Sequence, residues 1–152
     1  MTTTTTPNTS VVEALRQVVA DTYSLLGLTH FCHWNVEGPQ FFALHNAFEE
    51  QYTELFTAVD EIAERIRALG AYSPGGLSAL AAMAPFPTVE EGATAREMVD
   101  ALVQAQEILT GHLAEAREAA AGAGDNETED LMIARIQVHE KTTWMLRSFQ
   151  KG

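Results

Sequence analysis

The chain has 152 residues, of which 46% are hydrophobic, and its formal net charge is −12. This length and composition predict one globular domain with a sizeable core and exclude a disordered chain. The negative charge argues against a general nucleic-acid binder, which needs Lys and Arg to contact phosphates. It favours cations as partners, although a plain soluble surface explains the charge equally well.

The single cysteine, Cys32, cannot form an internal disulfide, which fits a reducing, cytoplasmic setting. The opening sequence MTTTTTPNTS lacks the basic and apolar regions of a signal peptide. The longest uncharged stretch, residues 68–89, contains three prolines and three glycines. We therefore expect it to be a loop with a short helix at LSALAAMA, and not a membrane span.

The first helix is expected to follow a threonine-rich flexible tail at residues 1–9, so that the domain occupies 10–152. Ser10 and Glu13 have the spacing of a capping box that opens this helix. Positions spaced three and four residues apart then form one continuous inward face that ends at His33. The residues of this face are Val12, Leu15, Val19, Thr22, Leu26, Thr29 and His33.

A second helix is expected from Pro39, a good first-turn residue, to Gly70, a likely terminating glycine. Its apolar face holds Phe41, Leu44, Phe48, Leu55, Val59, Ile62, Ile66 and Leu69.

Two further helices complete the expected fold. The third begins at a cap formed by Thr88 with Glu91 or by Thr94 with Glu97, and it runs to about Ala121. After a turn at 122–124, Asp125 or Asn126 caps a fourth helix that ends near Phe149 and carries Leu131, Ile136 and Met145. Because no strand pattern appears, we predict an all-α four-helix bundle with one long crossover.

A row of potential metal ligands follows the second helix. His45 and Glu49 are four residues apart, as are Asp60 and Glu64, and eleven residues separate Glu49 from Asp60, so all four share one face. Imidazole and carboxylate together suit iron, zinc or manganese. Each residue alone is explained as a surface charge or a core histidine. Their coincidence with His33 on faces expected to point inward favours a metal site.

The separation of these residues decides how such a site is assembled. His45 and Glu64 are nineteen residues apart, roughly 28 Å along a continuous helix, so they cannot bind one ion within a chain. In two antiparallel copies of the helix, His45 meets Glu64 and Glu49 meets Asp60 when one two-fold axis passes at position 54.5. The spacing therefore predicts two identical sites in a symmetric dimer, which His33 is placed to complete.

The chemistry of this ligand set predicts an open metal site and not a closed structural one. A carboxylate-rich site with one or two imidazoles leaves coordination positions open and stabilises Fe(III) through hard oxygen donors. No Glu-x-x-His motif occurs in the sequence, which argues against a di-iron centre within one bundle.

The spaced motif formed by HWNVEG at 33–38, His45, Glu49 and DEIAER at 60–65 resembles that of the Dps proteins, the mini-ferritins, and the similarity extends over nearly the whole chain. The resemblance implies a ferritin-like bundle with a short extra helix in the connection between helices two and three. It also implies assembly of two-fold dimers into a hollow dodecamer.

Function follows from the same resemblance. It implies ferroxidase centres between subunits, where Fe(II) is oxidised, generally by hydrogen peroxide, before ferric iron is stored in the shell. This chemistry protects against oxidative damage. The implied ligands are His33, His45 and Glu49 of one subunit with Asp60 and Glu64 of its partner. Glu49 stands where many relatives have aspartate.

Other residues acquire expected roles from the family. Trp34 matches a tryptophan beside the ferroxidase site that takes up oxidising equivalents, and packing is its alternative role. Asp125, Glu129 and Asp130 are candidates for lining a pore through which Fe(II) enters, and ordinary helix N-terminal chemistry explains them equally well.

DNA binding, which the family name suggests, is not expected because no Lys or Arg precedes Arg16 and the C-terminal end offers only Arg147 and Lys151. The main alternative function is sequestration of zinc or other divalent ions, or a stress-linked assembly role, in the same fold without significant ferroxidase activity. His30, His112 and His139 are expected to be structural or surface residues, and Cys32 a buried small hydrophobe or a redox residue.

Overall fold

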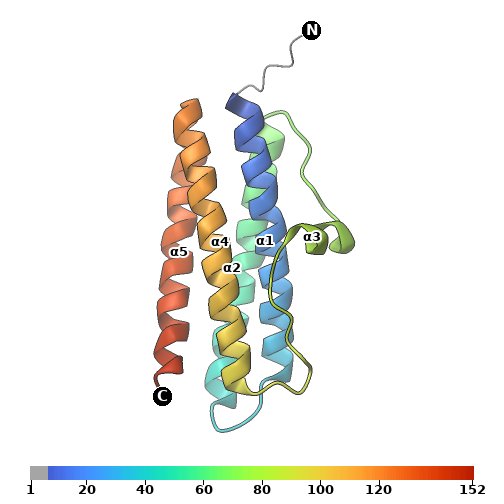
Figure 1. Cartoon of the computed structure of the whole chain (residues 1–152), viewed down its shortest axis with the longest axis vertical. Helices are drawn as coiled ribbons and strands as arrows, with labels where there is room; N and C mark the ends of the chain where they lie inside the picture. Colours follow the sequence, from blue (N-terminus) through green and yellow to red (C-terminus); the bar gives the residue numbers. More distant parts are fainter. Residues whose placement is uncertain (1–6) are drawn as a thin grey trace.

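A computed structural model describes residues 7–152, which form five helices and no strand. The helices are α1 (Pro7–Asn35), α2 (Phe41–Ala68), α3 (Leu77–Met83), α4 (Ala95–Ala123) and α5 (Asn126–Gln150). The four long helices lie side by side, and short α3 lies outside them next to α1 (Figure 1). This confirms the expected all-α four-helix bundle with an extra helix in the long connection.

The connection between α2 and α4 spans the length of the bundle, so these two helices run in the same direction (Figure 1). The hairpins α1–α2 and α4–α5 are antiparallel. Leu80 of α3 is buried, and Gln17 of α1 donates a hydrogen bond to the backbone oxygen of Met83 at 2.9 Å. The crossover is thereby fastened to α1 at the end of α3.

Several helix ends are set by residues that the sequence identified. Gly70 adopts a φ of 91°, and the backbone N–H of Ala71 reaches the oxygen of Ile66 at 3.2 Å, which closes α2. Thr94 and Glu97 form the reciprocal capping box of α4. Asp125, and not Asn126, caps α5 by accepting from the N–H of Thr128 at 3.1 Å.

Other expected boundaries are wrong. The first helix begins at Pro7, so Ser10 and Glu13 lie inside α1 and form no capping box, and residues 7–9 belong to the bundle. Proline is tolerated in a first helical turn, and Asn8 ties that turn to the oxygen of Leu69. The remaining tail, residues 1–6, lies outside the described part of the chain.

Two turns also differ from expectation. Pro39 lies in a turn closed by the bond from the N–H of Phe41 to the oxygen of Gly38 at 3.0 Å, and α2 begins only at Phe41. Gly122 is helical, and the α4–α5 turn is confined to Gly124 and Asp125.

The core is made by the inward faces of all four long helices, as predicted for α1 and α2, with Leu26, Phe41 and Leu69 only partly buried. On α5 the expectation was less accurate, because Met145 is 44% exposed while Ile136 is buried. The polar residues Arg135, His139 and Thr143 occupy inward positions of this helix, so its hydrophobic residues alone do not mark its buried face. No helix within residues 7–152 is long and apolar enough to cross a membrane.

Candidate metal centre

Two histidines join the end of α1 to the start of α2. The Nδ1 atom of His33 lies 2.8 Å from the backbone oxygen of His45, and Nδ1 of His45 lies 2.7 Å from the backbone oxygen of His33. The two rings stack with their centroids 3.8 Å apart, and the ring of Phe41 also stacks on that of His45 with 5.0 Å between centroids. The Gly38 turn brings the helices back on each other and so makes this pairing possible.

The pairing fixes which nitrogens are available to a metal. A carbonyl oxygen can only accept, so both Nδ1 atoms carry the proton and donate. In the neutral imidazoles the lone pairs are therefore on Nε2, the arrangement that second-shell hydrogen bonds produce in metal-binding histidines. The sequence predicted both histidines as ligands, but it contained no sign that each would orient the other.

Glu49 lies next to this pair. One of its carboxylate oxygens is 3.9 Å from Nε2 of His33, and its side chain is 59% exposed, whereas that of His33 is 8% exposed. One side of the expected metal site thus lies within a single chain, as an oriented imidazole pair with an exposed carboxylate beside it.

The other expected ligands, Asp60 and Glu64, lie farther along α2. The helix is continuous from Phe41 to Ala68, as the distance argument required. Asp60 and Glu64 are exposed, as Glu49 is, so the expectation that these carboxylates point into the bundle is wrong for the single chain. Within residues 7–152, no three histidine, cysteine or carboxylate side chains lie close enough together to hold a metal ion.

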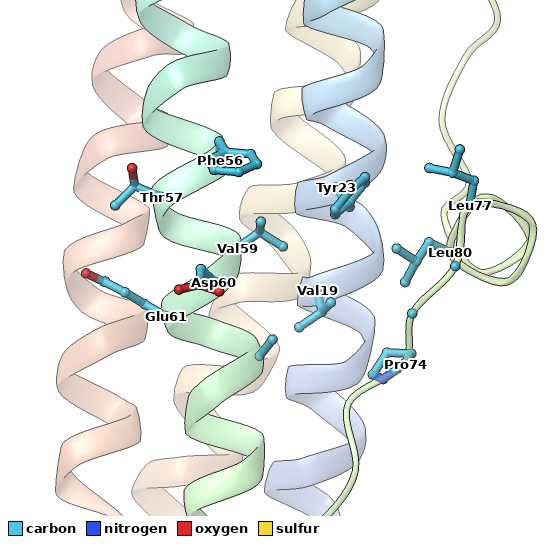
Figure 2. Close-up of a pocket in the computed structure, with 13 residues that line it drawn as sticks. Val19, Tyr23, Phe56, Thr57, Val59, Asp60, Glu61, Pro74, Leu77 and Leu80 are labelled. Carbon is cyan, nitrogen blue, oxygen red and sulfur yellow. The ribbon is translucent and has the colours of Figure 1, made fainter.

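Asp60 lines an open pocket of about 650 Å³ between α1, α2 and the segment leading into α3. Figure 2 shows Asp60 on α2 near Phe56, with Tyr23 of α1 and Leu77 of α3 on the far side. Phe56 and Leu77 are 66% and 74% exposed. The acidic end of α2 is therefore bordered by apolar side chains that this chain leaves uncovered.

Trp34 follows His33 but points away from the core, with 64% of its surface exposed. Its ring contacts that of His30 in a tilted arrangement, with 3.9 Å between the centroids. The ring of His30 lies 4.4 Å from that of Tyr52, which approaches His33 edge-on at 5.1 Å. Trp34 therefore packs on a neighbouring ring at the surface of the single chain and not in its core. The aromatic group around His30 was not predicted.

The three expected pore residues differ in their surroundings. Asp125 accepts hydrogen bonds from Thr128 and pairs with Arg65 at 3.0 Å, and its side chain is only 13% exposed. It acts as a helix cap and ion-pair partner, so it is not a free pore carboxylate. Asp130 is exposed and Glu129 is partly exposed.

Cys32, His112 and His139 have the structural environments expected from the sequence. Cys32 is fully buried, and burial raises the pKa of its thiol to about 12. His112 bonds to the buried carboxylate of Asp21, and His139 is buried in a polar cluster of α2, α4 and α5. In the sequence, the only signal for that cluster is that Arg135 and His139 are four residues apart, and so on one helix face, beside the apolar Ile136.

Comparison with known proteins places this geometry in a family. The chain matches the family model of the ferritin-like domain over residues 12–151. It is 39% identical to "DNA protection during starvation protein 2" of Bacillus anthracis over 142 residues, which are 93% of this chain and 97% of the relative. The chain therefore belongs to the Dps proteins of the ferritin-like family, as the motif indicated.

Solved structures agree with this assignment. Dps from Bacillus brevis has a TM-score of 0.90 at 37% identity, covering 94% of this chain and 96% of that one. Dps from Vibrio cholerae has a TM-score of 0.89 at 32% identity, covering 94% and 90%. The latter is described as a member of a broad superfamily of ferritin-like diiron-carboxylate proteins.

Proposed function

We propose that the protein is a mini-ferritin that binds Fe(II) at centres shared by two chains, oxidises it with hydrogen peroxide and stores ferric iron inside a hollow dodecamer. The observation that carries this proposal is the reciprocal bonding of His33 and His45, which leaves both Nε2 atoms available and places that of His33 beside Glu49. Membership of the Dps proteins supports it, because that fold implies iron sequestration and protection of DNA in starvation.

A second copy of the chain supplies what the first lacks. With a two-fold axis crossing α2 between residues 54 and 55, Asp60 and Glu64 of one chain meet Glu49 and His45 of the other. Phe56 lies next to that axis, so two exposed phenyl rings cover each other on association. Dimerisation thus buries apolar surface and brings carboxylates together, and that juxtaposition of like charge favours a bound cation.

The donor set fits ferrous iron as the substrate. Neutral imidazoles bind Fe(II), while the exposed carboxylates provide hard oxygens that favour Fe(III) and are free to move as the charge rises. Hydrogen peroxide takes one electron from each of two ferrous ions and, with protons, becomes water. Keeping both electrons at one centre prevents the one-electron reduction that releases hydroxyl radical.

Two neighbouring features have roles in the same proposal. Trp34, next to His33 and in ring contact with His30, takes up oxidising equivalents that escape the centre. The carboxylates of Glu129 and Asp130 at the start of α5 attract Fe(II) to a pore, with Asp125 acting as their structural support.

Protection of DNA is proposed to come from this chemistry and not from DNA binding. The first basic residue, Arg16, donates to the backbone oxygen of Tyr72 at 2.7 Å and is therefore engaged. Too few cations remain near either end of the chain for binding by counterion release. A gel-shift experiment in roughly 0.1 M salt is expected to show no retardation of DNA, and clear retardation would refute this part of the proposal.

Complementation between two inactive variants tests the shared centre. Chains carrying His33→Ala with His45→Ala, and chains carrying Asp60→Asn with Glu64→Gln, are each expected to be inactive in peroxide-dependent Fe(II) oxidation. After joint refolding, about a quarter of the wild-type rate returns, because random pairing makes half of the dimers mixed and each mixed dimer has one intact centre. Glu61→Gln, an exposed neighbour of Asp60, is the matched control and keeps full activity.

The outcomes separate the competing functions. No recovery on mixing, with both variants folded, contradicts a centre shared between chains. Wild-type protein that binds divalent metal at the same residues but leaves Fe(II) unoxidised is a sequestration protein, for which zinc is an equally suitable occupant.

A further inference from the structure

A second group of metal-ligand side chains lies between α2, α4 and α5 of a single chain, where the side chain of Glu54 is 42% exposed and its partners are buried. Arg135 of α5 makes two hydrogen bonds to the carboxylate of Glu54 on α2, one of them at 2.9 Å. The same guanidinium lies 2.9 Å from Nε2 of His139, and Nδ1 of His139 lies 2.7 Å from the side-chain oxygen of Gln106 on α4. Arg135, His139 and Gln106 are 5%, 1% and 2% exposed.

The hydrogen bonds define the protonation of this group. The amide oxygen of Gln106 only accepts, so Nδ1 of His139 carries the proton and Nε2 accepts from Arg135. Burial and the charge of Arg135 lower the pKa of His139 to about 3, so the imidazole is neutral. A carboxylate and an imidazole lone pair therefore converge on one cation, and Gln106 orients the imidazole as second-shell groups do around metals.

We propose that Arg135 occupies, with its own guanidinium, a cation position built from Glu54 and His139, and thereby keeps divalent metal out of the interior of the single chain. Arg135 is in this sense a specificity-determining residue, since it decides whether divalent metal can enter the position between Glu54 and His139. The inference concerns one chain only and does not depend on the proposed ferroxidase centre.

The imperfect fit of Arg135 supports this assignment. Its Nε atom is buried without a hydrogen-bond partner among residues 7–152, and so is the side-chain oxygen of Gln51 on the adjacent turn of α2. A purely structural ion pair in a protein interior is expected to have such donors and acceptors satisfied. Both Gln51 and Glu54 border a groove of about 350 Å³ between α2 and α5, which gives solvent ions a route to the cluster.

Shortening Arg135 tests the proposal, with Co(II) as the probe. The test uses the full chain carrying His33→Ala and His45→Ala, so that the surface ligands do not contribute. In this background Arg135→Ala is expected to bind about one additional Co(II) per chain, with a visible ligand-field spectrum. The gain must disappear when either Glu54→Gln or His139→Leu is added.

Thermal unfolding gives a second measurement that remains informative if the variant is unstable. Saturating Co(II) is expected to raise the Tm of Arg135→Ala by about 5–10 °C, or to restore its helical circular dichroism if the apoprotein is unfolded. Arg147→Ala is the matched control, because Arg147 also pairs a glutamate of α4 from α5 but is exposed, and it should gain no site. Absence of extra Co(II) and of any metal-dependent stabilisation in Arg135→Ala would overturn the proposal.

Discussion

Charged side chains are paired on one face of α2 and largely unpaired on the other. Towards α5, Glu54 is paired with Arg135, and Arg65 is paired with Asp125 and bonded to Thr128. On the other face, Asp60 and Glu64 are exposed, and Glu49 has only a 3.9 Å approach to His33. Both faces belong to one continuous helix.

The difference separates charged groups that are paired within the chain from those that are available to a metal or to a second chain. A polar group enclosed by the bundle must find its partner inside, because burying it unpaired costs free energy. Carboxylates left in solvent cost nothing in the single chain, and they remain available to a metal and to a second copy. Substitutions on the inner face should therefore lower stability, and those on the outer face should lower activity.

Asp60→Asn should produce the largest effect and tests the outer face directly. We expect Fe(II) oxidation to fall roughly 100-fold, as for the loss of a charged metal ligand, while the free energy of unfolding changes by less than about 0.5 kcal/mol. Stopped-flow absorbance measures the rate, and urea unfolding of the metal-free protein measures the stability.

His33→Ala refines this comparison, because His33 is a proposed ligand that is also bonded inside the chain. It should lose activity to the same extent and, in addition, about 1–2 kcal/mol of stability through its lost bond to the backbone of His45. Equal losses of stability in Asp60→Asn and His33→Ala would contradict the view that His33 is held by bonds within the chain while Asp60 is not.

The buried cluster should make stability depend on pH. His139 has a folded-state pKa of about 3 and an unfolded value near 6.5, so below pH 6.5 the unfolded chain binds a proton that the folded chain excludes. Stability is then lost as the pH falls, by about 2 kcal/mol between pH 7 and pH 5. Urea unfolding at both pH values should show this loss, and His139→Gln should remove that part of it.

Asp125→Asn tests the other inner contact. Partial burial acts to raise the pKa of Asp125, but the bonds from Thr128 and the charge of Arg65 outweigh it and hold the pKa below its usual value. Its contribution is therefore present at neutral pH and lost as the pH falls through the folded-state pKa. We expect a loss of about 1 kcal/mol at pH 7 that shrinks below about pH 4. An undiminished difference in acid would show that the charge is not involved.

Much of the fold was predictable because it rests on local chemistry. The capping box at Thr94, the cap at Asp125 and the glycine after α2 each act within a few residues, and the apolar faces of α1 and α2 repeat with helical spacing. The start of α1 was missed because it depends on a contact of Asn8 with the far end of α2.

The sequence proposed residues for the candidate site but could not predict their environment. Spacing along α2 identified His45, Glu49, Asp60 and Glu64. It did not reveal that the carboxylates face solvent, since hydrophobic periodicity does not fix the boundary of the buried face. Nor did it reveal the Arg135 cluster, because its members are separated by up to 85 residues and meet only in the bundle.

Substitution of Cys32, next to His33, should have the smallest effect on activity. It tests whether a buried residue beside a proposed ligand takes part in the chemistry. Its thiol is fully buried, and a pKa of about 12 leaves almost no thiolate at neutral pH. Cys32→Ala should therefore keep the iron-oxidation rate within about twofold, because an inert thiol can neither bind metal nor pass electrons. In the native protein, reaction with a thiol reagent at pH 8 should be much slower than in urea. Rapid labelling of the native protein together with a large loss of activity would place Cys32 among the groups that act on iron, and the inner side of α1 would then contribute to chemistry as well as to stability.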